Sequence, residues 1–348
     1  MDAVLLREAG GLGDILQIGA AATLLHRAGY VVHFYTLPDP ALLEMAGLIR
    51  SIDYVHPLRM SIKDRRARGV KTYRRLRYLG PVLAHALGTA NFGASRGPRK
   101  NKFLDMFCPA WAAELGDASE GRAPKFSRAQ SFVLAAGFTP SVAAPPKLRS
   151  TDHVSGLIDQ VHKRLGKKYT VLAPWAKDSC RSMSKGVPEL LDAITKEVGP
   201  VVVVDYGSPS AGEHYVLKKN VMWYSRDFHG QIDRSIAVHH VVELIKNSIG
   251  VVGVESGPVH IAASLNKPVA LICGPTLSSV ALRHYSRVVG CDSKTMPPSR
   301  SCAGCYYHRA RGFTPGCREH GCRVIGTITP EDVVSGLKEV CGCESLSV

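Results

Sequence analysis

Residues 250–276, GVVGVESGPVHIAASLNKPVALICGPT, contain two short apolar runs separated by a helical pattern. The first run ends at Glu255 and Ser256, and the second, Val269 to Cys273, stops at a Gly-Pro pair. Between the runs, apolar residues recur at helical spacing behind Pro258, and proline is favoured in the first turn of a helix. The stretch therefore predicts a strand–helix–strand unit, which builds parallel sheets.

The turn Glu255-Ser256-Gly257 has the features of an anion site. In open parallel sheets, ligands bind at the carboxyl ends of the strands. The first N–H groups of the following helix have no partners inside the helix, and the positive end of its dipole lies beside them. A diphosphate suits such a turn. Ser256 acting only as a helix N-cap is the alternative that the motif alone leaves open.

The same stretch resembles the nucleotide-sugar signature of glycosyltransferase family 9, the ADP-heptose:lipopolysaccharide heptosyltransferases. Their pattern is G-x-D-[ST]-G-x-x-H-x-A-A-x-x-x-K-P, followed by a strand and G-P-T. The positions that match are Gly253, Ser256, Gly257, His260, Ala262, Ala263, Lys267, Pro268, Gly274, Pro275 and Thr276. Glu255 departs from the family's Asp by one methylene group. The resemblance implies that Glu255, Ser256, Gly257 and His260 bind the nucleotide sugar, with His260 donating to a phosphate.

A second motif lies near the N-terminus. Residues 3–7 read as a strand and residues 10–14, GGLGD, as a Gly-rich turn before a helix. The turn lacks the G-x-G-x-x-G spacing, which argues against a nicotinamide cofactor. It resembles the family's G-x-x-G-D-[IV] loop, which implies that Gly13 lines the nucleotide-sugar site and that Asp14 is the general base for the acceptor hydroxyl. An Asp in the first turn of a helix is also favoured by the dipole alone, and this interpretation stays open.

A diphosphate leaving group needs cations or oriented N–H groups to stabilise its developing charge. The sequence has no D-x-D pair to suggest a metal-bridged diphosphate, so we expect no catalytic metal. Arg181 best matches the family's phosphate-binding cation, with Lys177 and Lys185 as rivals. In that loop Trp175 replaces a Gly, and Met183 stands where the family has Trp. Downstream of the apolar run 201–205, Glu213 is the nearest match for the Glu that holds the ribose hydroxyls.

The 348 residues, 45% of them apolar, suit two domains. We predict an N-terminal Rossmann-like acceptor domain (1–150), a C-terminal Rossmann-like nucleotide-sugar domain (151–330), and a terminal helix and tail (331–348). The Pro-rich segment 139–150 reads as the linker. Two βα-rich halves of this kind indicate an α/β protein of the GT-B architecture, and the resemblance implies the same, with chemistry in the cleft between the halves.

Further elements follow from apolar periodicity. A helix through Ile15, Ile18, Ala22 and Leu25 is expected to end near Gly29, before a strand at 31–36. We also predict a helix over 61–79, an exposed basic loop over 88–102, and a strand in the segment 169–176. In the second half we expect helices at 188–197, 241–249 and 330–339 and a buried strand at 201–205. His239 and His240 lack ligand spacing and are expected to be solvated.

The net charge of +15 is concentrated between residues 59 and 102, where thirteen Lys and Arg accompany a single acid, Asp64. Such asymmetry indicates an anionic partner. The residues that we expect to bind the acceptor are Arg65, Arg66, Arg74, Arg75, Arg99 and Lys100. The family's acceptor is the lipopolysaccharide inner core. Two alternatives stay open: DNA with hydroxymethylated bases as the acceptor, as in phage-type DNA glucosylation, and a non-catalytic nucleic-acid-binding protein on the same scaffold.

Ten cysteines are many for a cytosolic chain, and four of them cluster: Cys302, Cys305, Cys317 and Cys322. Such spacing favours a metal over disulfides in that compartment, and four thiolates suit a structural zinc ion. Reduced structural thiols are the alternative. No apolar run approaches the ~20 residues of a membrane span. The charged N-terminus does not resemble a signal peptide, so we expect a cytoplasmic protein that is able to touch a membrane surface.

Overall fold

A computed structural model describes residues 2–7, 11–57, 102–105, 126–149, 151, 154–176, 181–183, 185–205, 218–228, 234–276, 278, 284–294 and 322–342. The chain divides into two compact units. The first comprises residues 1–112 and 129–149, and the second residues 113–128 and 150–348. Among the helices of these described ranges, none is both long enough and apolar enough to cross a bilayer.

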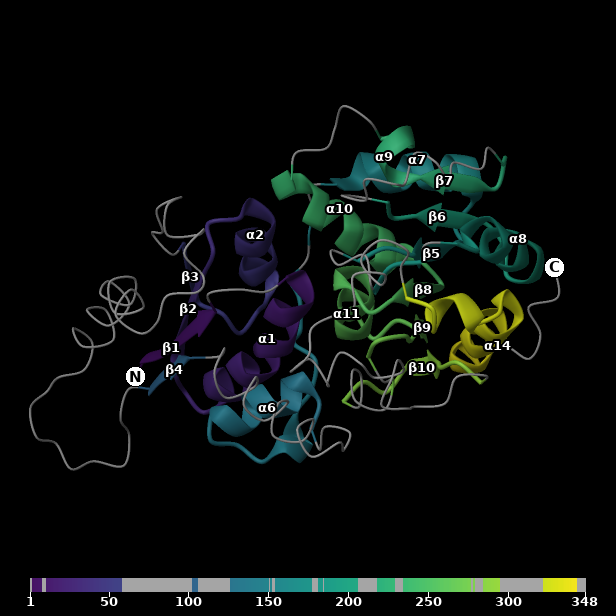
Figure 1. Ribbon diagram of the computed structural model, residues 1–348. Helices are drawn as coiled ribbons and strands as arrows, with labels where there is room; N and C mark the ends of the chain where they lie inside the picture. The colour runs from purple at the N-terminus through teal and green to yellow at the C-terminus, as the bar shows by residue number, and fades with distance from the viewer. Residues whose placement is uncertain are drawn as a thin grey trace, which may run out of the picture. The chain divides into compact units, whose positions relative to one another are not determined.

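The first unit contains a parallel four-stranded sheet in the order β3-β2-β1-β4 (Figure 1). The two helices that follow β1 and β2 pack on each other and on the sheet. The elements are β1 (Asp2–Arg7), α1 (Leu12–Arg27), β2 (Val31–Thr36), α2 (Pro40–Leu48), β3 (Tyr54–Pro57), β4 (Lys102–Asp105), α6 (Arg128–Ala135) and the 3₁₀ helix η1 (Pro140–Val142).

Helix α1 forms as the sequence predicts. Its predicted apolar positions Ile15, Ile18, Ala22 and Leu25 are all buried. The helix ends before Gly29, whose φ of +84° lies in the left-handed region that favours glycine.

The predicted linker segment packs on the first unit as far as Arg149. A Cβ on Gly19 of α1 would stand 2.7 Å from the ring of Pro146, so the glycine lets this segment approach the helix. The Arg149 N–H donates to the carbonyl of Leu48 at 2.7 Å, and the Arg50 N–H donates to the carbonyl of Lys147 at 3.0 Å. These main-chain bonds hold the segment against the end of α2.

The second unit contains a parallel six-stranded sheet in the order β10-β9-β8-β5-β6-β7. The strands β5 to β9 are buried at every position, as expected for a parallel sheet covered on both faces. The elements are α7 (Ser155–Leu165), β5 (Thr170–Ala173), α8 (Val187–Glu197), β6 (Val201–Val203), β7 (Val221–Trp223), α9 (Tyr224–Asp227), α10 (Arg234–Asn247), β8 (Gly250–Val254), α11 (Gly257–Ser264), β9 (Val269–Ile272), β10 (Val288–Cys291), the 3₁₀ helix η6 (Ile325–Thr327) and α14 (Pro330–Cys341).

This strand order is that of a doubly wound Rossmann sheet. The chain leaves β5 toward β6 and β7 on one side, then returns to build β8, β9 and β10 on the other. The order therefore reverses between β5 and β8, and the crevice at such a switch point, beyond the carboxyl ends of the strands, is where these sheets bind ligands. The loops that follow β5 and β8 begin at this point.

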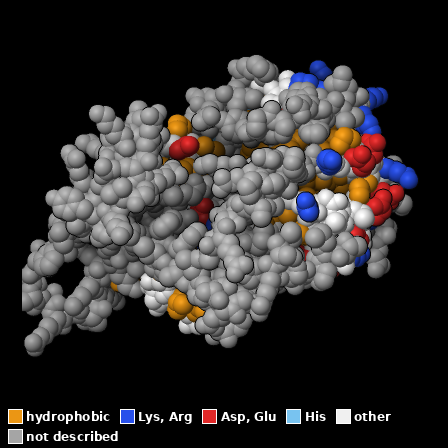
Figure 2. Space-filling model, in the orientation of Figure 1, with side chains coloured by type: hydrophobic (Ala, Val, Ile, Leu, Met, Phe, Trp, Pro, Cys, Tyr) orange, Lys and Arg blue, Asp and Glu red, His pale blue; other side chains and the backbone are white. Residues whose placement is uncertain are grey.

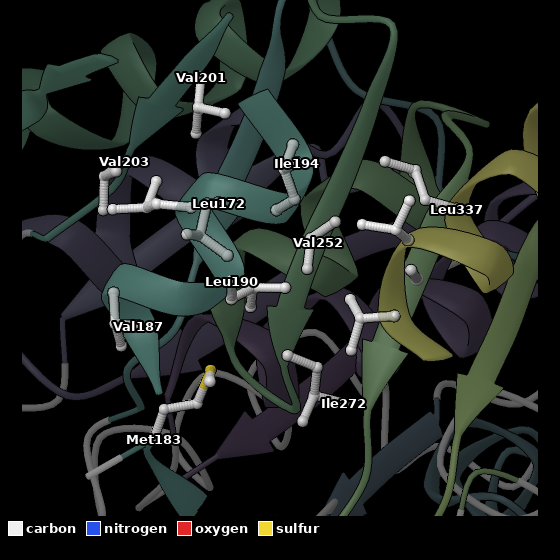
Figure 3. Close-up of a cluster of buried hydrophobic side chains, with 14 of the residues drawn as sticks. Leu172, Met183, Val187, Leu190, Ile194, Val201, Val203, Val252, Ile272 and Leu337 are labelled. Carbon is white, nitrogen blue, oxygen red and sulfur yellow. The ribbon is translucent and has the colours of Figure 1, made fainter. Parts of the chain in front are cut away.

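The core of the second unit packs helices against the strands that lead to the switch point. Figure 3 shows side chains of α8, among them Leu190 and Ile194, gathered with Leu172 of β5 and Val252 of β8. Leu337 of α14 packs into the same buried cluster. Burial of each such side chain is worth about 1.5–3 kcal/mol. The terminal helix α14 is thus part of the second unit's core.

Most predicted elements of the second half agree with the structure within two residues, but α10 begins at Arg234, seven residues before the predicted start. Ala237 and Val238 already belong to its buried face.

The expectation that His240 is solvated is wrong, because its ring is buried and its Nδ1 lies 2.9 Å from the Tyr224 hydroxyl. Lys102, placed in the predicted basic loop, starts β4, which pairs with β1.

The described surface of the second unit carries charges of both signs. Figure 2 shows acidic and basic side chains side by side near α8 and α14. Two of the ion pairs there are Lys338 with Glu197 and Lys218 with Asp192. This mixed surface differs from the basic segment 59–102, nearly all of which lies outside the described residues.

Candidate active site

The turn after β8 has an unsatisfied hydroxyl at the start of a helix. Ser256 is the N-cap of α11 and has an extended backbone, φ −153° and ψ 172°. Its side chain does not cap the helix, and within the described part of the chain its buried Oγ has no hydrogen-bond partner. Ser256 is only 9% exposed, and its hydroxyl lies at the helix end where the first N–H groups have no partners inside the helix.

The loop after β5 holds Arg181 in place. The Met183 N–H donates to the carbonyl of Pro174 at 2.9 Å, which closes the loop. Ser182 Oγ accepts from the Ala176 N–H at 2.9 Å and donates to its carbonyl at 3.1 Å. Met183, where the family has Trp, is buried in the core cluster shown in Figure 3. Its side chain anchors the C-terminal end of the loop two residues after Arg181.

The switch point brings Arg181 and Glu255 together although 74 residues separate them. Arg181 Nη1 donates to Glu255 Oε2 at 2.7 Å, and it also lies 3.4 Å from the Glu255 main-chain carbonyl. Both side chains are largely buried. Burial raises the pKa of the Glu255 carboxyl, but Arg181 and His260 outweigh that effect and hold the pKa well below its usual value of 4.5. Glu255 is therefore a buried carboxylate.

His260 lies one turn into α11 and is 1% exposed. Its Nε2 is 3.4 Å from Glu255 Oε1, and its Nδ1 is 3.3 Å from the hydroxyl of Tyr285. The ring of His284 is tilted by 41° against that of Tyr285, with the ring centres 4.0 Å apart, and its Nδ1 lies 3.1 Å from Ser127 Oγ. Burial, and secondarily His260, lower the pKa of His284 to about 3.

Sequence reasoning missed Tyr285, His284 and Ser127. None of them belongs to a motif, and Ser127 is 157 residues from its partner. The only signal was the pair of aromatic rings between two predicted elements, and that signal does not identify a contact with α11.

Two motif positions have structural roles. Lys267 Nζ donates to the carbonyl of Ser248 at 2.7 Å, just beyond the C-terminus of α10, where a cation is favoured. A Cβ on Gly253 would come within 2.8 Å of the Ala173 carbonyl, so this glycine permits the close approach of β8 and β5.

In the first unit, Asp14 occupies the third position of α1. Its Oδ2 accepts from the Gly11 N–H at 2.9 Å. Gly13 lies inside the helix, one residue before it. β1 lies between β2 and β4 in the sheet, so the order reverses beside it and the loop after it begins at a switch point. The Asp14 carboxylate thus has a helix-capping contact and the position expected of a ligand-facing group.

The remaining predicted site residues fall into two groups. Lys185 is described and is exposed just before α8. Outside the described residues lie Lys177, Glu213, Arg65, Arg66, Arg74, Arg75, Arg99, Lys100, Cys302, Cys305 and Cys317. Cys322 is described and partly buried, and its Sγ lies 3.1 Å from the position of a Cβ on Gly274. Across the portions that the structure describes, no three His, Cys, Asp or Glu side chains are grouped to hold a metal.

Comparisons with known proteins agree with this architecture. Residues 235–299 match the model of glycosyltransferase family 9 (heptosyltransferase). A search of curated protein sequences found no match. Among solved structures, ADP-heptose lipopolysaccharide heptosyltransferase II of E. coli is 14% identical, with a TM-score of 0.62 over 99% of each chain.

Two further heptosyltransferase structures share the fold. E. coli heptosyltransferase WaaC, solved with ADP-2-deoxy-2-fluoro heptose, is 13% identical, with a TM-score of 0.55 over 97% of this chain and 99% of its own. The iron-containing dodecameric glycosyltransferase TibC of enterotoxigenic E. coli is 14% identical, with a TM-score of 0.56 over 98% of this chain and 77% of its own. The family match over the signature and the fold shared along the chain identify this protein as a glycosyltransferase of the GT-B fold that resembles the family 9 heptosyltransferases.

Proposed function

We propose that this chain is an inverting, metal-independent glycosyltransferase that moves a sugar from a nucleotide-sugar donor to an anionic acceptor. The observation that carries the proposal is the juxtaposition of Arg181 with the turn that starts α11, where the buried Ser256 hydroxyl has no partner among the described residues. A cation, a hydroxyl and helix N-terminal N–H groups together suit the two phosphates of a nucleoside diphosphate. The family match covers this segment.

In the proposed reaction, the acceptor hydroxyl oxygen attacks the anomeric carbon and the bond from that carbon to the diphosphate oxygen breaks. The bonding electrons leave with the nucleoside diphosphate, whose added charge is stabilised by Arg181 and by the N–H groups of α11. The proton of the acceptor hydroxyl passes to Asp14 as general base. A single displacement inverts the anomeric configuration.

ADP-heptose is the first donor to test. The fold is shared with a heptosyltransferase solved with an ADP-heptose analogue, and the signature segment matches the same family. Lys177, Lys185 and Glu213 are proposed as further donor contacts on the sequence resemblance, with Glu213 at the ribose. Transfer from a panel of ADP, UDP and GDP sugars would show which nucleotide base the enzyme accepts.

The proposed acceptor is the lipopolysaccharide inner core, whose phosphates and acidic sugars are complementary in charge to the basic stretch 59–102. The family match favours an enzyme over the non-catalytic alternative. We propose a cytoplasmic location, with the acceptor presented at the membrane surface. The buried free thiols of Cys273 and Cys291 are in keeping with a reducing compartment.

The test offers ADP-heptose with a lipid A–core glycolipid or with hydroxymethylated duplex DNA, and detects the modified acceptor by mass spectrometry. The glycolipid is expected to gain one heptose, with inverted configuration by NMR. Transfer to DNA alone would replace the acceptor assignment, and no transfer from any nucleotide sugar would contradict the proposed activity. Transfer is expected to survive EDTA. Loss of transfer that Mg²⁺ or Mn²⁺ restores would contradict metal independence.

A further inference from the structure

The carboxylate of Glu255 is shared between two partners inside the second unit. Oε2 binds Arg181 at 2.7 Å, and Oε1 lies 3.4 Å from His260 Nε2. The Glu255 main-chain carbonyl approaches the same Nη1 group of Arg181 at 3.4 Å. Both contacts are made by the same nitrogen, so Glu255 fixes the position of Arg181 Nη1 through its carboxylate and through its main chain.

His260 is oriented in turn by Tyr285. A carboxylate only accepts hydrogen bonds, so His260 Nε2 is the donor toward Glu255. On the other side of the ring, His260 Nδ1 lies 3.3 Å from the Tyr285 hydroxyl. Burial raises the pKa of Tyr285, which keeps this hydroxyl protonated. Hydrogen-bonding contacts thus connect Tyr285, His260, Glu255 and Arg181 in one row.

The length of Glu255 matters to this geometry. An aspartate, the family's residue at this position, would withdraw the carboxylate by about one carbon–carbon bond, roughly 1.5 Å. The contacts to Arg181 and His260 would then exceed hydrogen-bonding distance unless the loop after β5 moved. That loop is closed by the main-chain bond between Met183 and Pro174, and Met183 is fixed in the core. The longer side chain is therefore matched to the position of Arg181.

We propose that Glu255, His260 and Tyr285 are positioning residues that fix the Arg181 guanidinium toward the diphosphate of the donor. This inference rests on the proposed function, since it takes the diphosphate as the ligand of Arg181. It gives Glu255 and His260 a different role from the direct ligand contacts that the sequence resemblance implies. Burial supports it, because an ion pair removed from water is costly to break and so stays in one arrangement.

The test measures binding of ADP and of adenosine by calorimetry, because only ADP presents phosphates to Arg181. Glu255→Gln keeps the length of the side chain and removes its charge, whereas Glu255→Asp keeps the charge and shortens the side chain. Both are expected to weaken ADP about tenfold or more and to leave adenosine unchanged. Tyr285→Phe should produce a smaller loss of the same kind. Asp192→Asn, which removes the carboxylate of an exposed pair in the same unit, is the matched control and should change neither ligand.

A double-mutant cycle separates positioning from direct contact. In an Arg181→Met background, Glu255→Gln is expected to cause no further loss of ADP affinity, because its effect passes through Arg181. The double variant removes both buried charges and so avoids an unpaired carboxylate. Additive losses would show that Glu255 touches the ligand itself, and equal losses for adenosine and ADP would show general damage to the site. Either result overturns the inference.

The wild-type protein separates this inference from the function on which it rests. If it binds none of ADP, UDP and GDP, the proposed function fails and the inference fails with it. If it binds one of them and the Glu255 variants bind that diphosphate equally well, only the positioning role is wrong.

Discussion

Ile325 fills the space above Gly274: a Cβ on this glycine would stand 2.5 Å from Ile325 Cγ1. The glycine of the Gly-Pro-Thr triplet therefore lets η6 pack over the carboxyl end of β9. Gly274→Ala is expected to lower the stability of the second unit by about 1–3 kcal/mol through overpacking. Thermal unfolding measures this loss. Gly326→Ala is the control, because a Cβ there would meet no atom within 4 Å, and an equal loss in both variants would contradict the packing argument.

The Thr329 side chain caps its helix and the Ser256 side chain does not, so their alanine variants should differ in stability and in ADP affinity. Thr329 Oγ1 accepts from the Asp332 N–H at 3.2 Å, so Thr329→Ala should lower stability by about 1 kcal/mol and leave donor affinity unchanged. The Ser256 hydroxyl, which has no partner in the described part of the chain, is assigned to the diphosphate. Ser256→Ala should weaken ADP roughly tenfold without loss of stability. Unchanged ADP affinity would leave Ser256 with no ligand role.

The pH dependence of stability should carry the signature of His284. Its pKa in the folded protein, about 3, lies below the usual 6.5, so below pH 6.5 the unfolded chain binds a proton that the folded chain does not. The contribution of His284 to the free energy of unfolding is therefore complete above pH 6.5, and it falls by about 1.4 kcal/mol for each pH unit below that value. Urea unfolding of the wild type and of His284→Asn between pH 7.5 and 5 should give stability curves that converge toward acid. Parallel curves would contradict the assignment.

The basic stretch 59–102 should set the affinity for the acceptor and not for the donor. Exposed cations act together and are screened within about 8–10 Å at physiological salt. Reversal of Arg65, Arg66, Arg74 and Arg75 to Glu should raise the acceptor KM strongly and leave the donor KM nearly unchanged. For DNA, log affinity should fall linearly with log salt at about −0.9 per phosphate contacted, whereas a glycolipid should give a shallower slope. Insensitivity to both salt and charge reversal would remove the support for an anionic acceptor.

The sequence predicted those parts of the fold where a local pattern determines the element. The segments 31–36, 257–264 and 330–341 have clear periodicity and end signals, and each forms close to its expected bounds. The start of α10 was missed because His239 and His240 interrupt the apolar pattern. His240 is nevertheless buried, and the Tyr224 hydroxyl satisfies its ring, a contact across sixteen residues that periodicity does not reveal.

The site was predictable only in part for the same reason. A motif indicates which residues follow a strand, so Ser256 and Arg181 were found as candidates. The pairing of Arg181 with Glu255 depends on β5 and β8 being neighbours, which is a property of the strand order. The contact of Tyr285 with His260 depends on how the segment before β10 packs over α11, and the spacing of the sequence carries no information about it.

Asp14→Asn tests the central claim most directly, since that claim assigns donor binding to the second unit and the general base to the first. The Asn side-chain oxygen can still accept from the Gly11 N–H, so the start of α1 should remain intact while the base is lost. The measurement is the rate of heptose transfer from ADP-heptose together with the Kd for ADP. We predict a ~10²–10⁴-fold lower rate with an unchanged Kd, and a rate equal to that of the wild type would contradict the account.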